Sequence, residues 1–145
     1  MKPLHQLLYH IPSWLITAVV AVAIALLLLL PQPLPDDMYR IQWFYGADKV
    51  VHALMFAALG AAIITDSRLS KTTARWSRTH LAAAITAATL IATAYGGAME
   101  LIQDFLAMGR EGSWGDLAAD AIGAAGGSLL LGFVTYQHTT TCYNS

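Results

Sequence analysis

Ionisable and polar side chains in this sequence gather at the borders of long apolar segments. An ionisable group at the centre of a membrane helix costs about 2.5–3.5 kcal/mol, so each such residue needs a physical reason. Carboxylates beside a histidine suit proton transfer, an ion-pair network or the ligation of a divalent metal. The residues concerned are Asp48, Lys49, His52, Glu100, Gln103, Arg110, Ser113, Asp116 and Asp120.

The spacing of these residues places several of them on shared helix faces. Asp48 and His52 are four residues apart, as are Asp116 and Asp120, and residues at this spacing lie on one side of a helix. Asp120 lies about 6 Å beyond Asp116, inside its apolar segment, and has no basic neighbour there. It therefore requires a partner from elsewhere. The candidates are His52, Lys49, Arg110 and a bound cation.

Each residue also has a purely structural interpretation. Asp48 and Asp116 are suited to capping the helices that they begin, with help from Ser113 in the second case. His52 equally fits a satisfied interior histidine, and Glu100 a solvated side chain at the headgroup level. Together they fit a closed ion-pair network. The spacing matches no tight metal motif, and we predict neither a metal nor a cofactor.

The composition excludes several classes of protein. Of the 145 residues, 57% are hydrophobic and only 12% are charged, against about 25% charged residues in ordinary soluble domains. Such a chain is not disordered. A formal net charge of −1 gives no basic surface for a nucleic-acid partner. The single Cys142 supports neither a disulfide framework nor a zinc cluster. We expect one membrane domain over residues 1–145.

Four apolar segments are predicted to cross a membrane as helices, because only helices satisfy their own backbone in lipid. In the first, Ser13–Leu30 is free of charge, spans about 27 Å and runs into Pro31. This is longer than the apolar region of a signal peptide, so we expect a retained helix. The fold class is all-α, an integral membrane four-helix bundle. The segments are about 11–30, 50–65, 81–99 and 117–136, followed by a polar tail, 137–145.

Lysine and arginine are distributed unevenly between the two sides of this arrangement. The side of the N-terminus, the second loop and the tail carries Lys2, Arg68, Lys71, Arg75 and Arg78. The other side carries Arg40, Lys49 and Arg110. The positive-inside rule then predicts a multi-pass protein with both termini in the cytoplasm. The ionisable residues described above gather at the outer end of the bundle.

Small residues recur at helical spacing in the last three segments. Gly123 and Gly127 form a GxxxG pattern in the fourth, and such rows let helix backbones approach closely in lipid. Packing within the bundle is the simpler interpretation, and a homo-oligomer formed through these two glycines is the alternative. The first segment ends in a run of leucines, so we expect it at the lipid-exposed edge.

In order and spacing, the polar residues resemble the VanZ-like family of small membrane proteins. The matching pieces are Asp48-Lys49-x-x-His52, Glu100-x-x-Gln103 and Arg110-x-x-Ser113-x-x-Asp116-x-x-x-Asp120-x-x-Gly123, which cover roughly Asp48 to Gly127. Asp120 departs from the family pattern, in which asparagine is usual. The resemblance implies a four-helix protein of the bacterial cytoplasmic (inner) membrane, related to one associated with resistance to the glycopeptide teicoplanin. It supplies no reaction.

Three functions fit these residues. The leading hypothesis is an outward-facing polar site that binds a lipid-linked or glycopeptide group of the cell envelope. Such a site would have a role in glycopeptide susceptibility, and membrane lipid would be a further partner. There Arg110 and Lys49 would contact an anionic group, for which arginine is well suited. An enzyme acting on envelope lipids would instead use Glu100 or Asp116 as base and His52 as acid. The third hypothesis is a purely structural membrane interaction module.

Overall fold

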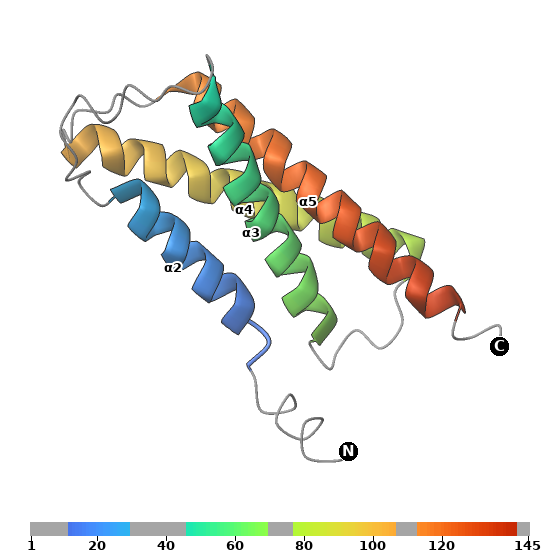
Figure 1. Ribbon diagram of the computed structural model, residues 1–145. Coiled ribbons are helices and arrows are strands. Elements are labelled where there is room, and N and C mark those ends of the chain that lie inside the picture. Colours follow the sequence, from blue (N-terminus) through green and yellow to red (C-terminus); the bar gives the residue numbers. More distant parts are fainter. Residues whose placement is uncertain (1–11, 30–45, 70–76, 107–112, 142–145) are drawn as a thin grey trace.

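Over the residues that it describes, a computed structural model of the protein contains four α-helices (Figure 1). The structure describes residues 12–29, 46–69, 77–106 and 113–141, and these contain no strand. The predicted all-α four-helix bundle is therefore confirmed. The helices are α2 (Leu15–Leu29), α3 (Ala47–Leu69), α4 (Arg78–Leu106) and α5 (Trp114–Thr141).

Helices α3 and α5 pack with their backbones in direct contact (Figure 1). Gly123 and Gly127 of α5 face the carbonyl groups of Ala53 and Ala57 of α3, and a Cβ atom at either glycine would collide with these carbonyls. The GxxxG pattern thus serves packing within the chain, as one of the two interpretations predicts. A homo-oligomer formed through these two glycines would require α3 to leave this face.

Helix α2 lies at the edge of the bundle, as the sequence predicted. Among the described residues it packs against α3 and α4 but not against α5. Ile24 and Leu28 are its buried residues and join a core that includes Phe56 of α3. Val22 and Leu26, on other faces of α2, are exposed. Burial on one side and apolar exposure on the other are expected of a helix that borders lipid.

Three helices are long and apolar enough to cross a membrane, which indicates a multi-pass membrane protein. They contain the stretches Ala47–Arg68, Arg78–Leu106 and Trp114–Gln137. Helix α2 is more apolar than these three but has only 15 residues, or about 22 Å of length. Residues 11 and 30 of the predicted first segment lie outside the described residues. The other three helices extend beyond the predicted segments at both ends, so the polar residues at the segment borders are helical.

Polar side chains from α3 and α4 hold the two ends of α2. The backbone N–H of Thr17, in the first turn of α2, donates to Oδ2 of Asp66 at 2.7 Å. At the other end, Nε2 of Gln103 donates to the carbonyl of Leu28 at 3.0 Å. The first N–H groups and the last carbonyls of a helix lack partners within it. Both Asp66 and Gln103 are buried, and they supply such partners where water has little access.

Candidate functional site

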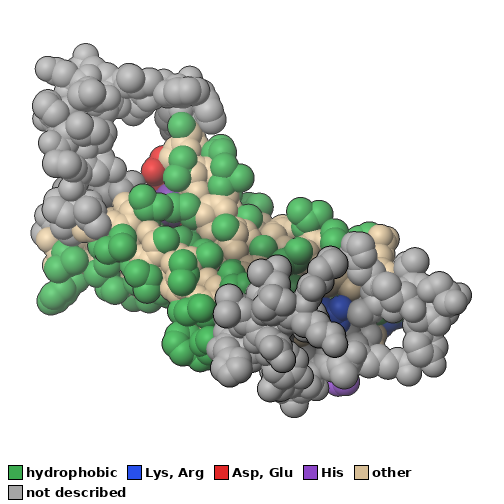
Figure 2. All heavy atoms as spheres, turned by 60° about the horizontal axis from the view of Figure 1, so that its bottom comes forward, with side chains coloured by type: hydrophobic (Ala, Val, Ile, Leu, Met, Phe, Trp, Pro, Cys, Tyr) green, Lys and Arg blue, Asp and Glu red, His purple; other side chains and the backbone are tan. Residues whose placement is uncertain are grey.

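The ionisable residues of α3, α4 and α5 meet where α3 and α5 begin and α4 ends, a region here called the polar end (Figure 1). Figure 2 shows acidic side chains beside a histidine at one end of the visible face, and lysine or arginine side chains together with histidine toward the other. Hydrophobic side chains cover much of the described surface between them. The acidic residues that the sequence analysis singled out therefore converge on one end of the bundle, as the sequence predicted.

The deepest polar contact at this end joins His52 of α3 to Asp120 of α5. The two residues are 2% and 1% exposed, and Nδ1 of His52 lies 2.9 Å from Oδ1 of Asp120. One helical turn further along α3, the ring of Phe56 stacks with the imidazole at a centroid distance of 6.5 Å. His52 is thus the partner that the position of Asp120 required, and the pair is shielded from water.

The second carboxylate oxygen of Asp120 has no matching partner. Oδ2 is buried and forms no hydrogen bond with any residue that the structure describes. It lies against Gly96 of α4, where a Cβ atom would collide with it. Glycine at this position makes room for the carboxylate between the helices. A buried oxygen without a partner costs about 1–3 kcal/mol, so a cation, proton or water at Oδ2 would stabilise the site.

Glu100 connects the end of α4 to the beginning of α5. Its Oε2 accepts a hydrogen bond from the backbone N–H of Ser113 at 2.9 Å. The Oγ of Ser113 in turn accepts from the N–H of Gly115 at 3.2 Å, so Ser113 is the N-cap of α5. Asp116 is the third residue of the helix, and its interpretation as the cap is wrong. Glu100 is half-buried and structurally engaged, which differs from a merely solvated carboxylate.

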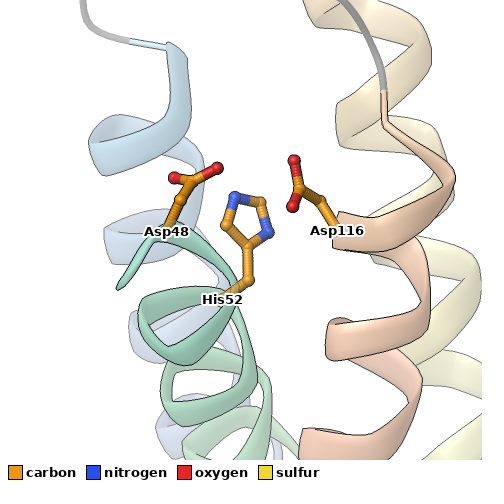
Figure 3. Close-up of side chains that lie close together, drawn as sticks. All are labelled: Asp48, His52 and Asp116. Carbon is orange, nitrogen blue, oxygen red and sulfur yellow. The ribbon is translucent and has the colours of Figure 1, made fainter. Parts of the chain in front are cut away.

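Asp48 and Lys49 form the exposed part of the polar end, and the buried Asp116 lies beside them. Nζ of Lys49 lies 3.0 Å from Oδ1 of Asp116, with the side chains 51% and 12% exposed. Figure 3 shows Asp48 and Asp116 on opposite sides of the His52 ring. Gly46, whose φ of 92° favours glycine, directly precedes α3, so Asp48 is the second residue of the helix and lies inside its first turn. A carboxylate there is favourable to the helix dipole.

Among the described residues, two overlapping groups of side chains lie close enough together to hold a metal ion. Within each group, one ligand atom per residue lies within 4.8 Å of the others. The first group is Asp48, His52 and Asp116 (Figure 3). The second is His52, Glu100 and Asp120. Sequence spacing predicted no metal, because the residues come from different helices and form no local motif. The packing of the helices brings them together nevertheless.

A cavity of about 480 Å³ lies between α4 and α5 beside the polar end. Such a volume is within the range of small-molecule sites. Its polar lining comes from Glu100, Asp104 and Ser113, which sit at the end of α4 and the start of α5. Glu100 therefore belongs both to the cavity wall and to the second group of ligand atoms. The apolar lining includes Gly97, Ala98, Leu101, Trp114 and Leu117.

Not every predicted site residue joins this arrangement. The amide of Gln103 contacts the backbone of α2, one turn beyond Glu100, and serves the packing of that helix. Arg110 lies outside the described residues. Sequence reasoning gave no role to Asp66, which is buried at the opposite end of α3. A carboxylate inside the last turns of an apolar helix was the available signal, since such a group needs a partner.

Similarity to known proteins adds nothing to this description of the site. No family model matches the chain, and no curated protein or solved structure matches it either. The resemblance to the VanZ-like family, which depends on the order and spacing of the residues at the polar end, therefore stays a prediction.

Proposed function

We propose that this chain is a VanZ-like protein of the bacterial cytoplasmic membrane that binds an amphiphilic molecule of the cell envelope at its polar end. The cavity between α4 and α5 is the observation that carries this proposal. Leu101 and Trp114 line it and are themselves widely exposed, so the cavity is open toward the surface that lipid would cover. An acyl or prenyl tail fits its apolar part, and a lipid-linked or glycopeptide head group fits its polar part.

The proposed orientation has both termini in the cytoplasm and the polar end facing outward. The excess of lysine and arginine at the opposite end supports it, since Arg68 lies in the last turn of α3 and Arg78 begins α4 there. In this orientation the cavity mouth lies at the outer leaflet. Envelope precursors and glycopeptides both act on that side, which gives the site its proposed role in glycopeptide susceptibility.

The charges around the cavity favour a head group rich in hydrogen-bond donors. Glu100 and Asp104 line the cavity as carboxylates, with the Ser113 hydroxyl beside them. The ammonium of Lys49 is hydrogen-bonded to Asp116, so an anionic head group would have to compete with that carboxylate. Amino and hydroxyl groups, as on a sugar or an amino-bearing glycopeptide, are electrostatically complementary to this lining.

A pair of glycine substitutions tests this proposal. At Gly97 a Cβ atom would meet only Leu117, at 3.7 Å, so Gly97→Leu can fill the cavity without a backbone collision. At Gly126 a Cβ atom meets nothing within 4 Å, which makes Gly126→Leu the matched control. We expect Gly97→Leu to weaken binding of an acylated glycopeptide by about tenfold or more, and the control to change it by less than about twofold.

The same assay distinguishes the two sources of the ligand. The full chain in lipid nanodiscs is titrated with an acylated glycopeptide, with its deacylated form, and with a polyprenyl-linked disaccharide. Stronger binding of either the acylated glycopeptide or the polyprenyl-linked disaccharide identifies the source, and the binding of both should depend on Gly97. Equal binding of the acylated and deacylated glycopeptide, or equal effects of the two glycine variants, would contradict a tail in this cavity.

The contacts between helices at the polar end favour a second candidate function, a structural membrane interaction module. Two pairs join α3 to α5, namely Lys49 with Asp116 and His52 with Asp120. A third contact, from the Ser113 N–H to Glu100, joins α5 to α4. If locking the helices is the only role, substitutions here lower the free energy of unfolding while probe binding at the cavity is absent.

A further inference from the structure

We propose that His52, Glu100 and Asp120 bind a divalent metal ion at the polar end. This inference does not require the amphiphile. Ligand atoms of the three side chains lie within 4.8 Å of one another. Around a single Zn²⁺, nitrogen and oxygen ligands at about 2.0–2.2 Å are separated by about 3–4 Å. Small side-chain rotations are therefore enough to close the three donors around one ion.

The unpartnered oxygen of Asp120 is an independent reason to place a cation here. Asp120 is 1% exposed, and its Oδ1 is engaged by His52 while its Oδ2 has no hydrogen-bond partner in the described part of the chain. Gly96 leaves room for this oxygen between α4 and α5. An ion that contacts Oδ2 gives a buried carboxylate the second interaction that the surrounding helices do not provide.

The charge of the group also favours a divalent ion. Oxygens of Glu100 and Asp120 approach within 4.8 Å, and two carboxylates at this distance repel each other unless a cation or a proton lies between them. Imidazole together with carboxylates suits ions such as Zn²⁺, Co²⁺ and Mn²⁺. One such ion would compensate both carboxylates and leave His52 as the neutral ligand.

The group that contains Asp120 is the better metal site of the two because of where its residues lie. In the group of Asp48, His52 and Asp116, Asp48 is exposed and Asp116 is already bonded to Lys49. The group containing Asp120 is more deeply placed, and its Glu100 also lines the cavity between α4 and α5. Through Glu100, the proposed metal site borders this cavity. Asp104 and Ser113 line the same cavity.

Titration of the purified full chain with Co²⁺, after removal of bound metal with a chelator, tests the proposal. Co²⁺ bound by nitrogen and oxygen ligands is visible by its d–d absorption, so binding and ligation are read together. We expect about one ion per chain, with an affinity that falls at acidic pH because protons compete for the same ligands. Glu100→Gln and Asp120→Asn should each weaken binding by about tenfold to a hundredfold or more.

These two variants are chosen because they preserve the structural contacts. Glutamine keeps an oxygen that can accept from the Ser113 N–H, and asparagine keeps one that can accept from His52. Asp104→Asn is the matched control, since Asp104 lies four residues after Glu100 and lines the same cavity. It should change Co²⁺ affinity by less than about threefold.

Three outcomes would overturn the assignment. They are no Co²⁺ binding by the folded chain, binding that Glu100→Gln and Asp120→Asn leave unchanged, and binding lost only on substitution of Asp48 or Asp116. Far-UV circular dichroism of each variant verifies that the helices are retained. Loss of glycopeptide binding in Gly97→Leu with Co²⁺ binding intact would separate this metal site from the proposed amphiphile site.

Discussion

Two buried aspartates lie near opposite ends of the bundle, Asp66 in the last turns of α3 and Asp120 in the first turns of α5. They have different partners. Asp66 and Asp120 are 5% and 1% exposed. Each has one carboxylate oxygen in a hydrogen bond and the other without a partner among the described residues. Asp66 accepts from the backbone N–H of Thr17, whereas Asp120 contacts the imidazole of His52. The difference lies in what surrounds the charge.

This comparison teaches that burial of a carboxylate does not by itself indicate a functional site. The first turn of α2 offers Asp66 unpaired N–H groups and the positive end of a helix dipole, which stabilise an anion. The Asp120 carboxylate contacts the imidazole of His52 and lies close to Glu100. Such a group of side chains can exchange a proton or bind a metal ion. We therefore assign a structural role to Asp66 and a binding role to Asp120.

The largest expected effect concerns the sides of the membrane on which the two ends lie. With Cys142→Ser as background, Ser77→Cys places a thiol beside α4 at the basic end, and Trp114→Cys places one at the polar end. Both native residues are exposed. An impermeant thiol reagent applied to intact cells should label only position 114, and label position 77 only after lysis. Labelling of both positions in intact cells would remove the contrast between the ends.

Substitution of Asp120 by alanine should produce the largest loss of stability. Removal of one partner from a buried pair leaves the other uncompensated, which costs about 3 kcal/mol. His52 would then be buried beside Phe56 without its hydrogen bond to Asp120. The free energy of unfolding in mixed detergent micelles measures this loss. Asp116→Asn, which affects a pair with the half-exposed Lys49, is the control, and its expected cost is below about 1 kcal/mol.

Substitution of Asp66 should cost less, because its role is that of a helix cap. We expect Asp66→Ala to lower the free energy of unfolding by about 1–2 kcal/mol, and Asp66→Asn by less, since asparagine keeps an acceptor for the Thr17 N–H. Thr65→Val serves as the control, because the Thr65 hydroxyl donates to the carbonyl of Ala61 within α3 and therefore does not join two helices. A loss as large as that of Asp120→Ala would contradict the proposed difference between the two aspartates.

The smallest expected effect is that of Lys49→Met. The Lys49 side chain is 51% exposed, and ion pairs at such positions contribute at most about 1 kcal/mol. High salt should weaken this pair in the wild-type chain, so the difference between wild type and variant should shrink in 1 M salt. A salt-independent loss of several kcal/mol would show that the accessible part of the polar end is as structural as the buried pair.

The convergence at the polar end could be predicted from the sequence because it depends on regular features. His52 lies four residues after Asp48, and Asp120 four residues after Asp116, which places each pair on one face of its helix. Because successive helices run in opposite directions, the start of α3, the end of α4 and the start of α5 lie at the same end of the bundle. The edge position of α2 followed in the same way from its leucine-rich end. These conclusions require only helical periodicity and the direction of each segment.

The contacts of Asp66 and Gln103 could not be predicted, for a physical reason. Both side chains bond to backbone atoms of α2, at Thr17 and Leu28. Such contacts depend on how far α2 slides along α3 and α4, and an edge helix of uniform apolar composition carries no pattern that fixes this position. Helix ends were also underestimated, because apolar segments show the hydrocarbon core while helices continue into the polar layer.

The most direct test of the central contrast compares Asp120→Asn with Asp66→Asn in one experiment, as the thermal unfolding of each variant with and without saturating Co²⁺. A ligand that binds only the folded chain raises its unfolding temperature. We predict that Co²⁺ stabilises wild type and Asp66→Asn by the same number of degrees, and that Asp120→Asn loses this response. An equal response in both variants, or none in wild type, would contradict the assignment of binding to one end and of capping to the other.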